Sequence, residues 1–100
     1  MEYPDAEVDG FLLGMFASHG DCGDAWVRAP DGSVGTLIWE TGEPEDIRIR
    51  KPPDPNGRWG TYSVRLPLPL TTNDEAAYFL RALLPRLRIC WEEWKQSRSG

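Results

Sequence analysis

The sequence predicts a single α+β domain over residues 1–100, an antiparallel sheet of three to four strands packed by a C-terminal helix. Two patterns predict this class. Apolar residues between 72 and 94 recur at spacings of four and three, which places them on one face of a helix. Short segments between 25 and 66 alternate apolar and polar residues and are separated by Pro and Gly, which is typical of strands. No repeat or linker indicates a second domain.

A short N-terminal helix is expected before the strands. Its apolar positions have helical spacing: Val8, Phe11, Leu12, Met15 and Phe16. Asp5 or Pro4 is available to start this helix and Gly20 to end it. Gly10 and Gly14 weaken it by about 1 kcal/mol each. A strand is the alternative, because Phe11, Leu13 and Met15 also alternate; helix is slightly favoured.

The next segment predicts a β-hairpin. Its arms are 25–28 and 34–40, joined by a turn in which Pro30 restricts φ and Gly32 tolerates a positive φ. Both faces of the second arm carry apolar groups, so we expect this strand to be central or covered. A polar loop over 18–24 precedes the hairpin.

Two further strands are expected. In 46–51, Ile47 and Ile49 alternate with arginines, which indicates one buried and one exposed, cationic face. The Pro-rich stretch 52–57 predicts a loop, and 59–66 alternates again as a strand that ends at Pro67.

The C-terminal helix has a well-marked start. Thr72 and Glu75 have the spacing of a capping box, in which each side chain accepts a hydrogen bond from the other residue's amide. Pro85 removes a backbone donor, so the helix is expected to be kinked there, or Pro85 begins a second helical segment. An unbroken helix over 72–94 spans about 35 Å, which is about the diameter of a compact globule of this size.

Charge is divided unevenly along the chain. Residues 1–46 hold eleven acids and one base, for a charge of −10, whereas residues 47–100 hold ten bases and five acids, for +5. The halves either interleave in the fold and cancel or form an acidic binding face. The five tryptophans exceed what one core needs, so some should be partly exposed. No apolar run is long enough to cross a bilayer, and the start of the chain lacks the basic residues of a signal peptide, so a cytoplasmic location is expected.

No pattern indicates catalysis. His19 and Cys22 are the one pair that resembles a reactive site, but Asp21 and Asp24 disfavour a thiolate beside them. Zinc-ligand spacing, calcium loops and phosphate-binding loops are not found, so no catalytic residue, metal or cofactor is expected. Cys22 and Cys90 are expected to be reduced thiols. A basic aromatic patch for single-stranded nucleic acid is a weaker alternative, because the acidic total opposes it. Its members are Arg48, Arg50, Lys51, Arg58, Trp59, Tyr62 and Arg65.

The stretch 24–40, in a small acidic α+β chain, resembles the compact immunity proteins of bacterial toxin systems. The resemblance implies a protein that docks an acidic or aromatic face over the active site of a toxin. We therefore expect a non-enzymatic protein-binding module, in which an acidic, Trp-bearing face meets a basic partner. Two alternatives are a structural or regulatory subunit that forms a homodimer and a small Cys/His enzyme. The expected partner-binding residues are Asp21, Asp24, Asp31, Trp39, Glu40 and Glu43.

Overall fold

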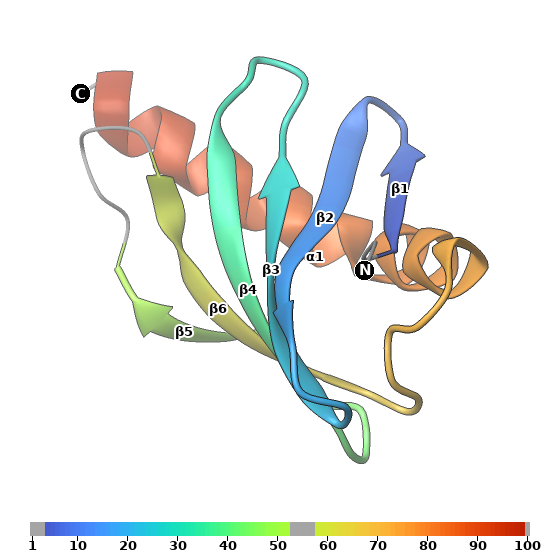
Figure 1. The fold of residues 1–100 in the computed structure, drawn as a ribbon. Helices are drawn as coiled ribbons and strands as arrows, with labels where there is room; N and C mark the ends of the chain where they lie inside the picture. The colour runs from blue at the N-terminus through green and yellow to red at the C-terminus, as the bar shows by residue number, and fades with distance from the viewer. Residues whose placement is uncertain (1–3, 53–57, 100) are drawn as a thin grey trace.

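A computed structural model shows one six-stranded sheet with a single long helix on one of its faces, and describes residues 4–52 and 58–99 (Figure 1). The strand order in the sheet is β1-β2-β3-β4-β6-β5. Helix α1 lies behind the twisted strands in Figure 1, so the opposite face, which we call the open face, is turned toward the viewer. The elements are β1 Asp5–Val8, β2 Phe11–Ser18, β3 Cys22–Arg28, β4 Val34–Thr41, β5 Arg48–Lys51, β6 Arg58–Leu66 and α1 Asn73–Ser99.

The α+β class is confirmed, but the expectation of three to four strands in an antiparallel sheet is wrong. The sheet has six strands and is mixed, because β4 and β6 run parallel. After β4 the chain passes over one strand position, forms β5 at the edge, and returns with β6 in the gap. Sequence alternation identifies strands but carries no information on their order, so this arrangement was not predictable from it.

The expected N-terminal helix is also wrong, because this segment forms the hairpin β1–β2. Its two-residue turn, Asp9-Gly10, has φ values of 53° and 84°, as a type I′ turn requires. Asp-Gly between apolar alternations is a strong hairpin signal, and it outweighs the helical spacing. Phe11, Leu13 and Met15 are then buried together on the face that meets α1.

The predicted hairpin β3–β4 is confirmed, with Arg28 opposite Val34 and Ala25 opposite Leu37. Strand β4 is central, between β3 and β6, as its two apolar faces predicted. The predicted strands over 46–51 and 59–66 correspond to β5 and β6. Most of the loop expected over 52–57 lies outside the described residues.

The capping box at the start of α1 is confirmed. The Glu75 amide donates to Thr72 Oγ1 at 3.1 Å, and the Thr72 amide donates to Glu75 Oε1 at 3.0 Å. The amide and hydroxyl of Thr71 also donate to this carboxylate, and these hydrogen bonds lower the pKa of Glu75. The helix start is therefore determined by local chemistry.

Helix α1 is continuous for 27 residues, so a second helical segment beginning at Pro85 is excluded. Pro85 is exposed within it, and the kink at this position stays a prediction. At about 1.5 Å per residue the helix is about 40 Å long, and the molecule measures 40 × 23 × 23 Å. The domain is therefore elongated, and its longest extent is close to the length of α1. It is not the rounder globule that its chain length alone would predict.

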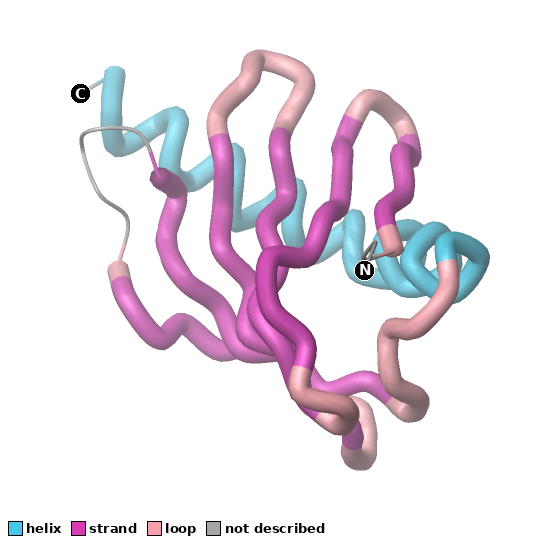
Figure 2. Tube along the Cα trace, viewed as in Figure 1, coloured by secondary structure: helices cyan, strands magenta, loops and turns pink. Residues whose placement is uncertain are grey.

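Two strand turns meet the C-terminal half of α1 at the same end of the sheet (Figure 2). Arg88 forms an ion pair with Asp9 in the β1–β2 turn at 3.2 Å. Trp91 Nε1 donates to Ser33 Oγ in the β3–β4 turn at 3.1 Å. These contacts set the position of the helix along the sheet, whose buried face supplies the core together with the apolar stripe of α1.

Three tryptophans lie against glycines of neighbouring strands. A Cβ atom at Gly23 would lie 2.7 Å from Trp39 Nε1, and one at Gly35 would lie 2.8 Å from ring carbons of Trp59. Both indoles are in the core, at 1% and 0% exposure. The missing side chains of the glycines let these indoles lie close over the strand backbone. The third such position is on the open face, where a Cβ atom at Gly14 would overlap the indole ring of Trp26.

We expect Gly35→Ala to destabilise the protein more than Gly14→Ala. Trp59 is enclosed and cannot move aside, so the added methyl overpacks the core at a cost of about 1–3 kcal/mol. Trp26 is half-buried and can swing toward solvent. Urea unfolding of both variants and the wild type measures the two losses. A larger loss for Gly14→Ala would contradict this account of the core.

We expect Thr72→Ala to lower the free energy of unfolding by about 1 kcal/mol, because the Glu75 amide loses its acceptor. Thr71→Ala is the matched control. It removes the hydrogen bond from the Thr71 hydroxyl to the Glu75 side chain but leaves Thr72 Oγ1 in place as the acceptor for the Glu75 amide. Urea unfolding monitored by helical circular dichroism compares them. Equal losses in the two variants would show that Thr72 does not act as the cap.

Candidate functional site

The predicted partner-binding residues fall at three places in the fold. Asp21 and Glu43 lie in loops at one end of the sheet, where the Asp21 carbonyl accepts hydrogen bonds from the amide and hydroxyl of Thr41. Asp24 and Glu40 lie on the open face near that end, since the strands place their side chains opposite the core positions. Asp31 lies at the opposite end, in the β3–β4 turn. The structure therefore brings four of these six residues toward one end.

Trp39 does not belong to an accessible face. It is only 1% exposed, and its indole Nε1 donates to Met15 Sδ at 3.2 Å. Strand alternation places Trp39 on the same side of β4 as Leu37. That side faces the core and is covered by α1. The expectation that Trp39 anchors a partner therefore does not hold for this side chain.

Trp26 is the tryptophan on the open face of the sheet. Ala25 and Val27 are buried on the core side of β3, so Trp26 between them points the other way and is half-buried. Its ring lies over Gly14 of β2, and the Arg28 guanidinium lies 5.3 Å from the ring centre. In the sequence, the alternation of residues around Trp26 indicates that its side chain lies on the face opposite Ala25 and Val27. The neighbouring strand that carries Gly14 is missed, because the expected N-terminal helix covers that segment.

A hollow of about 610 Å³ borders Trp26. Its walls come from three parts of the chain: β1 and the residue before it, the strands β2 and β3, and the start of α1. The lining residues are Pro4, Asp5, Gly14, Met15, Trp26, Thr71, Thr72 and Asn73. The Asp5 amide donates to Asn73 Oδ1 at 3.0 Å, which ties the edge of the sheet to the helix beside the hollow.

Two acidic residues flank Trp26 on the open face, Asp5 and Asp24, while the Arg28 guanidinium lies against its ring. Asp5 is paired with Gly14, which is itself opposite Trp26, so these three residues form one row across the sheet. Asp24 is paired with Ile38, which is 37% exposed, in the next row. We call this set, Asp5, Gly14, Asp24, Trp26 and Ile38, the Trp26 face. It combines apolar area with negative charge.

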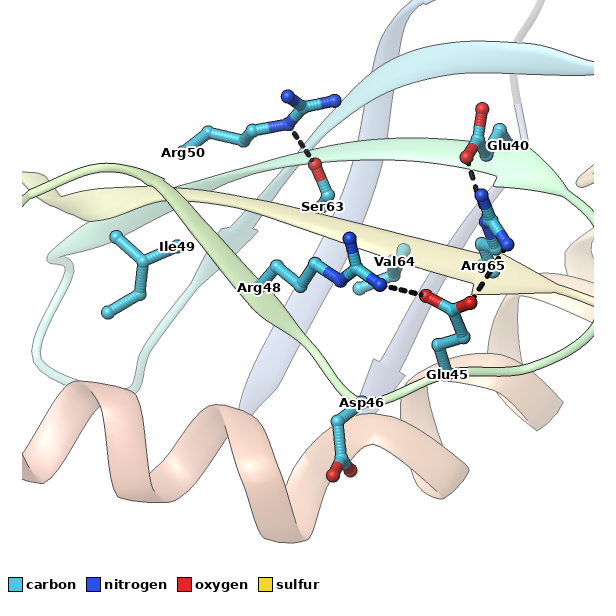
Figure 3. A pocket seen from close by; sticks show the side chains of 9 residues that line it. All are labelled: Glu40, Glu45, Asp46, Arg48, Ile49, Arg50, Ser63, Val64 and Arg65. Atoms are coloured by element: carbon cyan, nitrogen blue, oxygen red, sulfur yellow. Dashed lines mark hydrogen bonds and ion pairs between the residues drawn. The ribbon is translucent and has the colours of Figure 1, made fainter.

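The basic half of the chain supplies the other side of the open face, at β6 and β5. Arg65 of β6 forms ion pairs with Glu40 at 3.0 Å and Glu45 at 2.9 Å, and Arg48 of β5 pairs with Glu45 at 2.7 Å (Figure 3). The two halves therefore cancel in part where β4 and β6 meet. The β1 to β3 side keeps its acids, so the open face is acidic at one edge and basic at the other.

Asp31 belongs to a separate cluster at the turn end of α1. Its carboxylate accepts hydrogen bonds from the amide and hydroxyl of Ser33, at 3.0 and 2.6 Å. Partial burial raises the pKa of Asp31, but these hydrogen bonds and the nearby Trp91 and Lys95 outweigh it, and the pKa is lowered overall. Asp31 therefore stabilises the turn and its contact with the helix.

The basic aromatic patch does not assemble as a stacking platform. Trp59 and Tyr62 are 0% and 2% exposed, so neither ring is open to a base. Arg48 and Arg65 are paired with carboxylates, and the side chain of Arg58 lies outside the described ones. These positions do not favour binding of single-stranded nucleic acid.

His19 lies in the turn between β2 and β3, and Cys22 is the first residue of β3; both are exposed. The His19 amide donates to the Cys22 carbonyl at 2.8 Å, and within the described residues no hydrogen bond joins their side chains. The same described residues contain no group of three or more metal-ligating side chains. Both cysteines are free thiols. In 4–52 and 58–99, no helix is long and apolar enough to span a membrane.

We expect the two thiols to react with dithionitrobenzoate at neutral pH in a fast and a slow phase. Cys22 is exposed, whereas Cys90 is half-buried and burial raises the pKa of its thiol, which leaves less reactive thiolate. Cys22→Ser should remove the fast phase and Cys90→Ser the slow one, measured by absorbance. A fast phase that survives Cys22→Ser would contradict this assignment.

Compared with known protein families, curated proteins and solved structures, the chain matches none. Its function is therefore inferred from the geometry and charge of its surface.

Proposed function

We propose that this protein is a non-enzymatic binding module that docks the Trp26 face on a basic protein partner. The single observation that carries the proposal is the half-buried Trp26, seated on Gly14 on the open face, with Asp24 next to it along β3 and Asp5 in the same row of the sheet. An immunity or inhibitor protein of the cytoplasm, directed against a basic toxin, is the specific form that we propose.

The placement of Trp26 suits an interface anchor. Tryptophan is enriched among residues that contribute most to binding, particularly where neighbouring groups exclude water. Gly14 below the ring and Arg28 beside it hold the indole in one position before a partner arrives. Binding then loses little side-chain freedom, and the hollow bordered by Trp26 offers space for a partner's side chain.

The charge of the same region supports a basic partner. The strands β1 to β4 and the connections between them, residues 5–41, hold seven acids and one base, for a charge of −6. Negative potential on this side steers a positively charged partner and raises its association rate. The resemblance of residues 24–40 to immunity proteins points in the same direction, since such proteins meet their toxins through acidic or aromatic faces.

A homodimer is the second candidate, because Ile38 on the same face is 37% exposed and lies beside the half-buried Trp26. Two copies would bury this apolar area against each other in an isologous contact. The acids Asp5 and Asp24 would then face acids of the second copy across part of that contact. This repulsion is the reason that we place the basic partner first.

The test is capture of a partner from a lysate of the source organism, followed by calorimetry with the recovered protein. Trp26→Ala should weaken binding by about thirtyfold, because a central tryptophan typically contributes 2 kcal/mol or more. Asp24→Asn should weaken it less and reduce its dependence on salt. Tyr78→Ala is the matched control, since Tyr78 is an aromatic residue 65% exposed on α1, away from the sheet.

Unchanged binding by Trp26→Ala, with its urea unfolding curve intact, would contradict the proposal. Sedimentation at rising concentration separates the second candidate. A dimer that Trp26→Ala dissociates and Tyr78→Ala leaves intact would favour self-association through the Trp26 face.

A further inference from the structure

The two edges of the sheet are not equivalent. At one edge α1 packs along β1, and Asn73 accepts a hydrogen bond from the Asp5 amide. At the other edge β5 pairs only with β6, and all four of its residues are exposed. Among the described residues, nothing pairs with the outer backbone groups of β5. A strand edge of this kind is a template for a further strand.

The side chains of Arg48, Ile49 and Arg50 alternate between the two faces, and a register shift against β6 lies between Ile49 and Lys51. Arg48 and Arg50 point to the open face with Ser63, their neighbour on β6, whereas Ile49 points to the other face and is 63% exposed. A strand added beside β5 would place alternate side chains next to the arginines and next to Ile49. The edge therefore favours a segment in which acidic and apolar residues alternate.

Arg50 is the arginine of this edge that is free to bind an acid. Its Nε donates to Ser63 Oγ at 2.6 Å, which fixes the guanidinium, and it forms no ion pair with any described residue (Figure 3). Arg48 and Arg65 are by contrast held by Glu45. A cavity of about 220 Å³ lies beside the strand and is lined by these arginines and Ser63, and also by Glu40, Glu45 and Asp46, of which Glu40 and Glu45 are paired with Arg65 and Arg48. A carboxylate there would accept hydrogen bonds from the two remaining guanidinium nitrogens.

We propose that the β5 edge binds an extended acidic segment of a partner protein, which adds to the sheet as a further strand and places a carboxylate on Arg50. Backbone hydrogen bonds along β5 supply affinity, while Arg50 and Ile49 select an acidic and an apolar residue in alternation. This surface lies across the sheet from the Trp26 face and has the opposite charge, so it goes beyond the function proposed above.

Two other occupants fit the edge less well. Nucleic acid lacks a stacking surface, because the nearby rings of Trp59 and Tyr62 are buried. A second copy would have to offer its own acidic strand β1, which does alternate acidic and apolar residues. That strand is packed against α1 and its Asp5 amide is already bonded, so it is poorly placed to leave its own sheet.

The test uses a fluorescent peptide of about eight residues in which glutamate alternates with valine, with binding measured by fluorescence anisotropy. Arg50→Gln should weaken binding about tenfold, because hydrogen bonds to a charged group are lost. Arg81→Gln on α1 is the matched control and should bind as the wild type does. Glu45→Gln, which frees Arg48 and leaves Arg65 paired with Glu40 alone, should strengthen binding, a gain that a folding defect cannot mimic.

Two control peptides separate the parts of the proposal. Methylation of alternate backbone nitrogens should abolish binding, since it blocks strand addition, and replacement of glutamate by glutamine should weaken binding as Arg50→Gln does. Amide hydrogen exchange over residues 48–51 should slow in the complex. No binding of the glutamate peptide, equal binding of the methylated peptide, or association of the protein with itself through β5 would overturn the proposal.

Discussion

The packing of one long amphipathic helix across one face of the sheet is the constraint on which the rest of the structure depends. The buried residues of α1, among them Phe79, Leu80, Leu84, Leu87 and Trp94, supply much of the core. The sheet has no second layer among the described residues, so its other face must meet solvent or a partner. The open face is therefore a direct result of how the core is built. The Trp26 face is positioned by strands whose other side is covered by α1, whereas the β5 edge is held in place through β6.

The core is close-packed because large indole rings lie over glycines, which have no side chain. Trp39 over Gly23 and Trp59 over Gly35 each occupy space that a Cβ would take. Such contacts let the domain bury Trp39 and Trp59 fully, in addition to Trp94 on α1. The same device on the open face has another effect, since Gly14 holds Trp26 flat while leaving it half-exposed. One kind of contact thus stabilises the core and also prepares a surface anchor.

Charge and strand order together give the open face an acidic side and a basic side. Consecutive strands β1 to β4 carry the acids, and β6 and β5 follow with the arginines. Where the two groups meet, Arg65 and Glu40 neutralise each other, but the outer edges keep their own charge. The protein therefore presents an acidic surface beside Trp26 and a basic strand edge at Arg50. Partners of opposite charge can reach these surfaces independently, because they lie at opposite sides of the sheet.

The sequence by itself determined the features that depend on neighbouring residues. These are the capping box of Thr72 and Glu75, the hairpin around Gly32, and the presence of a strand at Arg48 to Lys51. The buried face expected for that strand is wrong, because all four of its residues are exposed and Ile49 is 63% exposed. The sequence also contained the Asp9-Gly10 turn signal, which the prediction of an N-terminal helix from apolar spacing did not take into account. Tertiary structure alone decided the parallel pairing of β4 with β6, the burial of Trp39 and the exposure of Trp26. Those outcomes depend on which strand lies beside which and on the side that α1 covers, and such long-range packing is not encoded in any local pattern.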